Sequence, residues 1–149
     1  MSDAVVTRAA AGRATEARAA AVAAACAFAG WAATPVRERI ALLMNAADAM
    51  TARADEVVEI ACAEVGSSPD WVRFNVGIAA AMLRQTADLA EVLDNTESPV
   101  AGHILRRRPA GVVLGIAPWN AAVTLPTRAV AAPLAYGNTI VLKGSELFP

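Results

Sequence analysis

The 149-residue sequence has few of the residues that build disulfide frameworks and metal sites. It contains two cysteines, Cys26 and Cys62, and one histidine, His103. Both cysteines stand in apolar stretches, where a free cysteine usually packs as a small buried hydrophobic residue. One histidine alone does not indicate a metal site. We therefore expect no disulfide and no metal, and a reducing compartment, with the cytoplasm as the default.

An excess of charge is also missing, because the formal net charge is −1 and the isoelectric point is about 5.8. A chain with so little net charge has no electrostatic bias toward nucleic acid or an acidic membrane surface. The three arginines at residues 106–108 have no aromatic residues between them and are typical of a solvated edge. We expect neither nucleic acid nor a membrane as a partner.

Long hydrophobic runs are absent too. The first 18 residues have no uninterrupted apolar core and include Asp3 and Glu16, which argues against a signal or transit peptide. Residues 19–33 are apolar throughout, but they are mostly alanine and fall short of the roughly 20 hydrophobic residues that cross a bilayer. We expect residues 1–18 to be a flexible segment and residues 19–33 to form a buried helix anchored by Phe28 and Trp31.

Helical periodicity is present from residue 36 to residue 93. It predicts one amphipathic helix starting at Val36, a second over residues 55–65, and a third over about residues 70–93 with Asp70 as its N-cap. Residues 37–39 are expected to face water. The apolar positions assigned to the core are Ile40, Leu43, Met44, Ala47 and Met50, then Val57, Val58, Ile60 and Ala61, then Trp71, Phe74, Ile78, Met82, Leu83 and Leu89. Residues 19–97 are thus a predicted helical part, followed by a linker or short hairpin at residues 98–110.

The last third of the chain has the pattern strand, helix, strand. Residues 111–117 are an apolar, β-branched run between Pro109 and Pro118, which predicts a strand buried on both faces. An alanine-rich stretch at residues 121–136 ends at Gly137 and Asn138, residue types that readily terminate a helix. Residues 139–143 form a second β-branched run. This order favours a right-handed parallel crossover, so we predict an α/β fold in which residues 111–149 begin an open parallel sheet.

Polar residues follow both predicted strands. Trp119 and Asn120 come after the first strand, and Lys143, Ser145 and Glu146 come after the second. Open parallel sheets bind ligands beyond the carboxyl ends of their strands, so these residues are a candidate binding site. In the alternative interpretation, Asn120 caps the helix and the two charges are solvated in a loop.

Three short motifs carry a resemblance to a known family. They are Pro118-Trp119-Asn120, Gly137-Asn138-Thr139 and Lys143-Gly144-Ser145-Glu146. Together they resemble the coenzyme-domain signature of the NAD(P)-dependent aldehyde dehydrogenase superfamily, which usually has a proline where this chain has Gly144. The resemblance implies a Rossmann-like coenzyme-binding sheet, NAD or NADP as the cofactor, and a small-molecule aldehyde as the substrate.

The resemblance also implies roles for individual residues. Asn120 matches the asparagine whose side-chain amide stabilises the oxyanion formed during the reaction. Lys143 and Glu146 match the pair that binds the adenosine ribose hydroxyls, with Ser145 in the same cofactor-binding motif. Trp119 matches a residue beside the nicotinamide site.

The sequence around Asn120 looks most like the branch that acts on aromatic aldehydes such as vanillin and salicylaldehyde. Within that branch, a small Ala121 leaves room for a ring, and Leu125 lies on the same side of the helix. Arg128 can then contact a polar substituent of the ring. An arginine that simply reaches solvent from a helix is an equally good interpretation of Arg128.

The family's cysteine nucleophile and acidic general base come later in its sequence than the motifs found here, and neither Cys26 nor Cys62 fits the role of the nucleophile. We therefore expect this chain to be an N-terminal fragment that is inactive alone, from an enzyme whose full-length form is a homo-oligomer. The alternative is a non-catalytic helical or nucleotide-binding module. No Gly-x-Gly-x-x-Gly motif follows a predicted strand to support a nucleotide-binding module.

Overall fold

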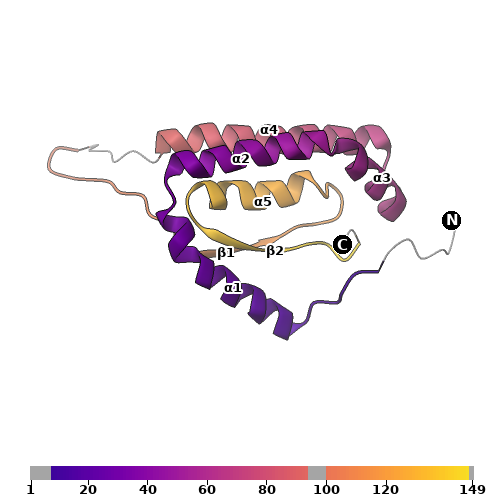
Figure 1. Ribbon diagram of the computed structural model, residues 1–149, viewed down its shortest axis with the longest axis horizontal. Helices are drawn as coiled ribbons and strands as arrows, with labels where there is room; N and C mark the ends of the chain where they lie inside the picture. Colours follow the sequence, from indigo (N-terminus) through magenta and orange to yellow (C-terminus); the bar gives the residue numbers. More distant parts are fainter. Residues whose placement is uncertain (1–7, 94–99, 148–149) are drawn as a thin grey trace.

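The computed structural model describes residues 8–93 and 100–147. Its elements are α1 (Ala14–Ala33), α2 (Val36–Ala52), α3 (Ala54–Val65), α4 (Pro69–Leu93), β1 (Val112–Ile116), α5 (Thr124–Ala135) and β2 (Thr139–Lys143). The two strands pair in parallel, α5 lies between the sheet and the layer of α2 and α4, and α1 crosses the opposite side (Figure 1). The predicted α/β fold is confirmed. The predictions for residues 1–7, for residues 94–97 of the helical part and for residues 98–99 of the linker lie outside the described residues.

Alanine dominates the core between the helices. α2 packs along α4, and α5 packs against both. Because the distance between packed helices depends on the side chains at their contact, alanines allow these three helices to approach closely. The predicted stripe of α2 is confirmed, since Leu43 and Ala47 are buried and its other members pack at their edge. The buried residues of this cluster are Leu43, Ala47, Ala80, Leu83, Ala87, Ala90, Ala131 and Ala135.

The buried face of α4 matches the predicted one only in part, since Leu83 is buried as predicted. Trp71, Phe74 and Leu89 are 46%, 57% and 55% exposed, although the sequence pattern assigned all three to the core. The inner face instead carries Val72 and Val76 against α3 and a row of alanines against α2. The prediction placed large side chains in the core, but small side chains fit the close contact between the helices better.

The predicted N-cap of α4 is also wrong. The helix begins at Pro69, and the Ser68 hydroxyl accepts the Trp71 backbone N–H at 3.3 Å.

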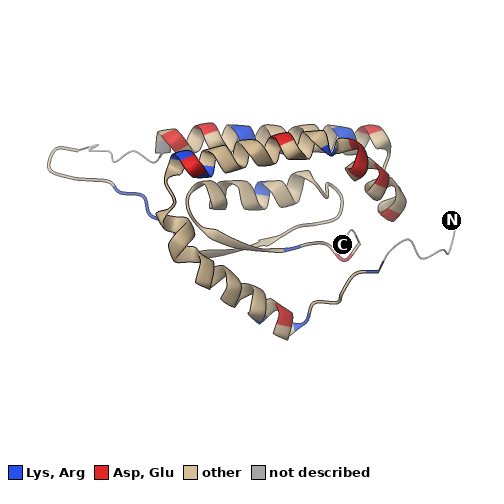
Figure 2. Cartoon of the chain, viewed as in Figure 1, with Lys and Arg blue, Asp and Glu red and all other residues tan. Residues whose placement is uncertain are grey.

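α1 lies on the surface and is not the buried helix expected at residues 19–33. None of its residues is buried, and Phe28 and Trp31 are only half-buried. It begins at Ala14, within the segment expected to be flexible, where the Glu16 carboxylate accepts the Arg13 backbone N–H at 2.8 Å. That hydrogen bond lowers the pKa of Glu16. Beyond its first turns α1 carries no charged side chain (Figure 2).

Two long-range hydrogen bonds attach α1 to the rest of the fold. The Trp31 indole N–H donates to the Leu134 carbonyl at 3.1 Å, and the Thr139 hydroxyl donates to the Ala24 carbonyl at 2.8 Å.

Within the described residues no single helix has the length and apolarity to span a bilayer. Helices α1 and α2 meet those criteria only together, as a pair bent by 118°.

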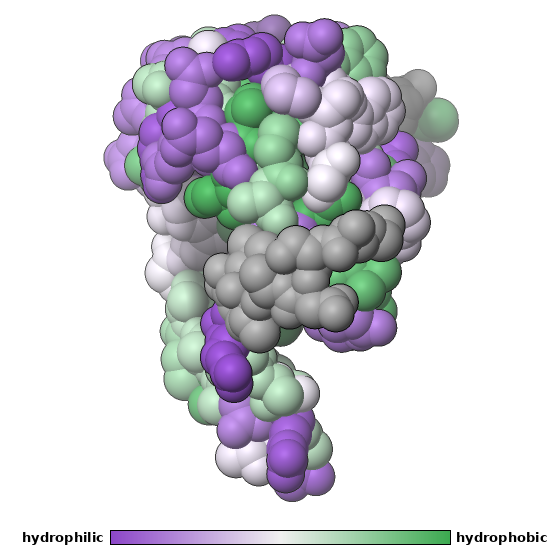
Figure 3. Space-filling view, turned by 90° about the vertical axis from the view of Figure 1, so that its right-hand side faces the viewer, coloured by the Kyte–Doolittle hydropathy of each residue, from purple (hydrophilic) through white to green (hydrophobic). Residues whose placement is uncertain are grey.

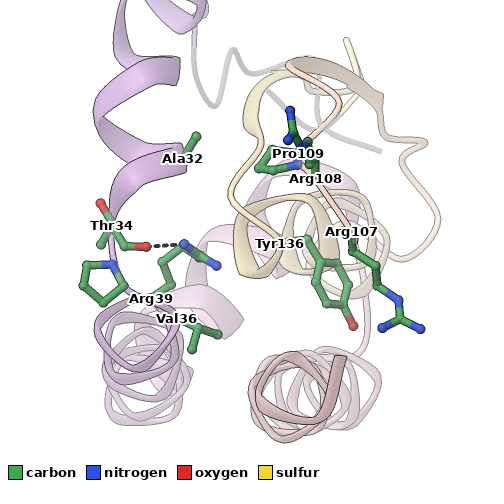
Figure 4. A pocket seen from close by; sticks show the side chains of 9 residues that line it. Ala32, Thr34, Val36, Arg39, Arg107, Arg108, Pro109 and Tyr136 are labelled. Atoms are coloured by element: carbon green, nitrogen blue, oxygen red, sulfur yellow. Dashed lines mark hydrogen bonds between the residues drawn. The ribbon is translucent and has the colours of Figure 1, made fainter. Parts of the chain in front are cut away.

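Arg39 is buried, whereas the sequence pattern placed it in water. It is 6% exposed, and its guanidinium donates to the Ala135 carbonyl at 3.0 Å and to the Thr34 carbonyl. These carbonyls lie at the C-terminal ends of α5 and α1, where a cation is favoured by the helix dipole. Arg39 borders a hollow of about 470 Å³ between the α1–α2 junction and residues 107–109, and its side chain points toward Thr34 (Figure 4). The arginine thus links the ends of two helices.

The sheet is covered well on one face only, so the prediction that β1 is buried on both faces is wrong. Gly115 faces α5, and a Cβ at this position would lie 3.1 Å from the Ala129 Cβ. Leu114 and Ile116 point to the other face and are 63% and 67% exposed. α1 reaches that face near Thr139, at the beginning of β2, and leaves the far ends of the strands uncovered.

Asn138 connects the beginnings of both strands to the end of α5. Its side-chain oxygen accepts the backbone N–H groups of Ala110 at 2.6 Å and Gly111 at 3.1 Å, and its amide nitrogen donates to the Pro133 carbonyl at 3.2 Å. Gly137 before it has a positive φ of 79°, and a Cβ there would lie 3.0 Å from the Pro109 side chain. The Gly-Asn-Thr motif is therefore explained by backbone geometry and by this link.

Leu83→Ala should lower the free energy of unfolding by about 2–5 kcal/mol, because it removes a buried side chain and leaves a cavity in the alanine-rich core. Leu89→Ala on the exposed side of α4 should change it by less than about 0.5 kcal/mol. Urea-induced unfolding followed by circular dichroism measures both. Equal losses would mean that α4 buries the face predicted from its large side chains.

Candidate active site

Both strands leave the sheet at the same edge. Val112 pairs with Thr139 and Ile116 with Lys143, and the ladder continues through a 3.0 Å hydrogen bond from the Ala117 N–H to the Lys143 carbonyl. Residues 118–120 and residues 143–146 therefore begin from neighbouring positions at the carboxyl ends of the strands (Figure 1). This is the edge at which an open parallel sheet binds its ligands.

Asn120 lies in the turn before α5 and does not cap that helix. α5 begins at Thr124, its N-cap is Val123, and no side chain accepts a hydrogen bond there. The Asn120 side chain is exposed and makes no hydrogen bond to the described residues, while its backbone carbonyl accepts the indole N–H of Trp71 at 3.3 Å. The capping interpretation is thus wrong. The side-chain amide is left accessible to a ligand.

Lys143 is the only lysine of the chain and ends β2. Its ammonium donates to the Gly144 carbonyl at 2.8 Å and lies 3.9 Å from the Glu146 carboxylate, with both side chains well exposed. An exposed ion pair of this kind contributes little to stability. The Ser145 hydroxyl accepts the Leu147 backbone N–H at 3.1 Å and so orders the loop that follows β2.

Ala121, Leu125 and Arg128 follow Asn120 into α5. Ala121 lies in the turn, and its carbonyl accepts the Leu125 N–H at 3.0 Å. Ala121 and Leu125 are half-buried and Arg128 is exposed. Figure 3 looks onto the end of the molecule at which the strands finish, and it shows hydrophobic surface below the mostly hydrophilic helical layer.

Two residues of α4, Trp71 and Asn75, line a cavity beside Asn120 and were not among the predicted site residues. Trp71 and Phe74 are exposed and stack with ring centroids 5.7 Å apart, and Asn75 is buried at 4% exposure. Trp71 and Asn75 share the lining of this small cavity, of about 20 Å³, with Trp119 and Asn120. The sequence pattern counted the two aromatic residues as core. The polar Asn75 beside the apolar Phe74 and Val76 was the one sequence signal that this part of α4 has a role other than core packing.

The cysteines do not complete the site. Cys26 on α1 is exposed, which contradicts the expectation of a buried residue, and Cys62 on α3 is half-buried beside the α3–α4 contact. Within residues 8–93 and 100–147, no group of histidine, cysteine and acidic side chains is arranged to hold a metal ion.

The comparison with known proteins identifies the class. The Aldehyde dehydrogenase family profile matches residues 1–149, and the chain belongs to this family of oxidoreductases. The sequence resemblance is thereby confirmed.

Particular relatives act on aromatic aldehydes. The chain is 46% identical over 149 residues to vanillin dehydrogenase from Pseudomonas fluorescens, covering 97% of this chain and 31% of that protein. It also superposes on the salicylaldehyde dehydrogenase of Pseudomonas putida G7, solved with salicylaldehyde, with a TM-score of 0.86, 38% identity and coverage of 91% and 29%. The NADP complex of glyceraldehyde-3-phosphate dehydrogenase from Bacillus halodurans C-125 matches with a TM-score of 0.82, 31% identity and coverage of 89% and 30%. The chain therefore spans about a third of the length of these relatives.

Gly144→Ala should be tolerated in the loop after β2. A Cβ at this position meets no atom within 4 Å, and Gly144 has no positive φ. Alanine restricts the unfolded chain, so the free energy of unfolding should rise by about 0.4–1 kcal/mol. Gly137→Ala is the contrasting control, because its positive φ and the contact with Pro109 should make it destabilising. Thermal melting compares the two, and a Gly144→Ala variant as unstable as Gly137→Ala would contradict the loop geometry.

Proposed function

We propose that this chain is the part of an NAD(P)-dependent dehydrogenase that holds the cofactor and stabilises the oxyanion while an aromatic aldehyde is oxidised to its carboxylic acid. The observation that carries the proposal is the convergence of Asn120 and the Lys143–Glu146 pair at one edge of the sheet. The complete enzyme is proposed to be cytoplasmic and homo-oligomeric. Its remaining catalytic groups come from outside these 149 residues.

The residues after β2 fit a dinucleotide cofactor. The Lys143 ammonium offers hydrogen-bond donors and the Glu146 carboxylate offers acceptors, which together suit the two hydroxyls of a ribose. The two groups are 3.9 Å apart and exposed, so a diol can replace their contact without leaving a buried charge. Trp119 is exposed beside Asn120, where it can bound the nicotinamide side of the site, and Ser145 orders the loop. The bound cofactor supplies the hydride acceptor of the oxidation.

Asn120 fits the role of a donor to developing negative charge. When a nucleophile adds to an aldehyde carbonyl, the oxygen becomes an anion, and a positioned amide N–H stabilises that anion more than the starting carbonyl. The exposed amide of Asn120 has no hydrogen-bond partner among residues 8–93 and 100–147 that would compete for this bond. Its backbone carbonyl is held by Trp71, which restrains the residue from the α4 side.

The surroundings of Asn120 support an aromatic substrate. Trp71 lines the cavity beside Asn120, and its exposed ring lies 5.7 Å from that of Phe74 between centroids, so an aromatic ring can pack against it. Ala121 adds little bulk, and Leu125 contributes an apolar surface from the following turn. Arg128 is exposed on α5 and can donate to a hydroxyl or methoxy oxygen of the ring. The vanillin and salicylaldehyde dehydrogenases among the relatives agree with this substrate class.

The 149-residue chain alone should form no NADH or NADPH from vanillin or salicylaldehyde, because neither Cys26 nor Cys62 lines the cavity beside Asn120, where a nucleophile would be needed. A complete dehydrogenase that carries this sequence should form the reduced cofactor, which absorbance at 340 nm measures. Turnover by the isolated chain that survives both Cys26→Ala and Cys62→Ala would contradict the division of the active site.

Lys143→Ala and Glu146→Ala in the complete enzyme should each weaken cofactor binding about tenfold or more, since a hydrogen bond to a charged group contributes about 1.5–3 kcal/mol. The preference among aldehydes should stay nearly unchanged. Titration of each variant with NADH or NADPH, followed by the fluorescence of the reduced cofactor, gives the dissociation constants. Unchanged constants in both variants would remove the ribose-binding role.

A further inference from the structure

Asn75 is a buried polar side chain on the inner face of α4. Only 4% of it is exposed, and its neighbours Val72, Val76 and Ala79 on the same face are apolar. An amide buried in such surroundings is unfavourable unless its polar atoms are hydrogen-bonded. The position therefore calls for a partner on another element.

The partner is Thr124, the first residue of α5. The Thr124 hydroxyl lies 2.6 Å from the Asn75 side-chain oxygen and 3.1 Å from the Asn75 backbone carbonyl. A hydroxyl has one proton to donate, and the shorter contact identifies the side-chain oxygen as its acceptor. The Asn75 amide nitrogen donates to the Trp71 carbonyl at 2.9 Å. Both polar atoms of the amide are thus satisfied, one within α4 and one across to α5.

This contact and a second one hold the two ends of the turn that contains Asn120. The turn covers residues 120–123, and Thr124 follows it directly. At its beginning, the Asn120 carbonyl accepts the Trp71 indole N–H at 3.3 Å. Trp71 and Asn75 are four residues apart and therefore lie on the same side of α4. One helical turn of α4 binds both ends of the Asn120 turn.

We propose that Asn75 and Thr124 are positioning residues that hold the Asn120 amide where the oxyanion forms. The inference rests on the proposed function, because it assigns the two residues a role in the same reaction. Neither Asn75 nor Thr124 is proposed to contact the substrate. A turn tied at one end only could shift by the fraction of an ångström that separates a good hydrogen bond from a poor one.

Thr124→Val in the complete dehydrogenase keeps the side-chain shape and removes the hydroxyl. It should lower kcat on the order of tenfold through misplacement of Asn120, with the dissociation constant of the cofactor unchanged. Thr124→Ser restores the hydroxyl and should recover the rate. The matched control is Thr127→Val on the same helix. The Thr127 hydroxyl donates at 2.8 Å to the carbonyl of Val123, the N-cap of α5, and the Thr127 backbone N–H donates to the same carbonyl at 3.2 Å, so that carbonyl keeps a partner in the variant. The control should change the melting temperature and leave kcat near normal.

Because Thr124→Val leaves the Asn75 oxygen without its partner, a second variant protects the test against misfolding. The double variant Asn75→Leu with Thr124→Val replaces both polar partners by apolar groups of similar shape, which can be nearly neutral for stability. It should fold and still show the lowered kcat.

A double-mutant cycle with Asn120→Ala decides whether the pair acts through Asn120. If it does, adding Thr124→Val to Asn120→Ala should cause little further loss. Additive losses would overturn the positioning role, and so would a Thr124→Val enzyme with the kcat of the Thr127→Val control. In either case the unsubstituted enzyme still oxidises aldehydes and the proposed function stands. An unsubstituted enzyme without aldehyde oxidation would overturn the proposed function and the positioning role together.

Discussion

The parallel pairing of β1 with β2 is the constraint on which the site depends. It requires the chain to cross over through α5 and return, and it brings two segments separated by more than 20 residues to one edge. Asn138 fixes this pairing from the opposite end, because its side chain binds the backbone before β1 and the last turn of α5 at once. A shift of register by one residue would turn every strand side chain to the other face. The ends that carry Asn120 and Lys143 are thus set by contacts at the beginnings of the strands.

The helical layer supports the site from above the sheet. Alanines at the contacts of α2, α4 and α5 allow close packing, and Arg39 joins the end of α5 to the end of α1 through two backbone carbonyls. α4 then lies near enough to reach the turn of Asn120 with Trp71 and the start of α5 with Asn75. The same packing that forms the core therefore orients the side of the candidate site that carries Asn120.

Much of this fold could be predicted from sequence patterns, because Gly and Pro mark its boundaries and periodicity marks its elements. The strand, helix and strand after residue 111 and the helices before residue 93 follow from those signals. The face that α4 buries could not be predicted, since alanines fill the contact and the larger Trp71 and Phe74 remain outside. The burial of Arg39 could not be predicted either, because it depends on the Ala135 carbonyl of α5, which lies 96 residues away in the sequence. The motifs located the edge of the site, while the contribution of α4 required contacts across 49 residues.

The central claim is that the exposed Asn120 amide stabilises the oxyanion, and Asn120→Ala in the complete dehydrogenase tests it most directly. Rapid-quench or stopped-flow measurement of a single turnover with saturating cofactor isolates the chemical step. The account predicts a rate lower by about 10²–10³, the usual loss for one oxyanion donor, with cofactor affinity nearly intact. It also predicts little change in melting temperature, because Asn120 does not cap α5. A single-turnover rate close to that of the unsubstituted enzyme would contradict the claim.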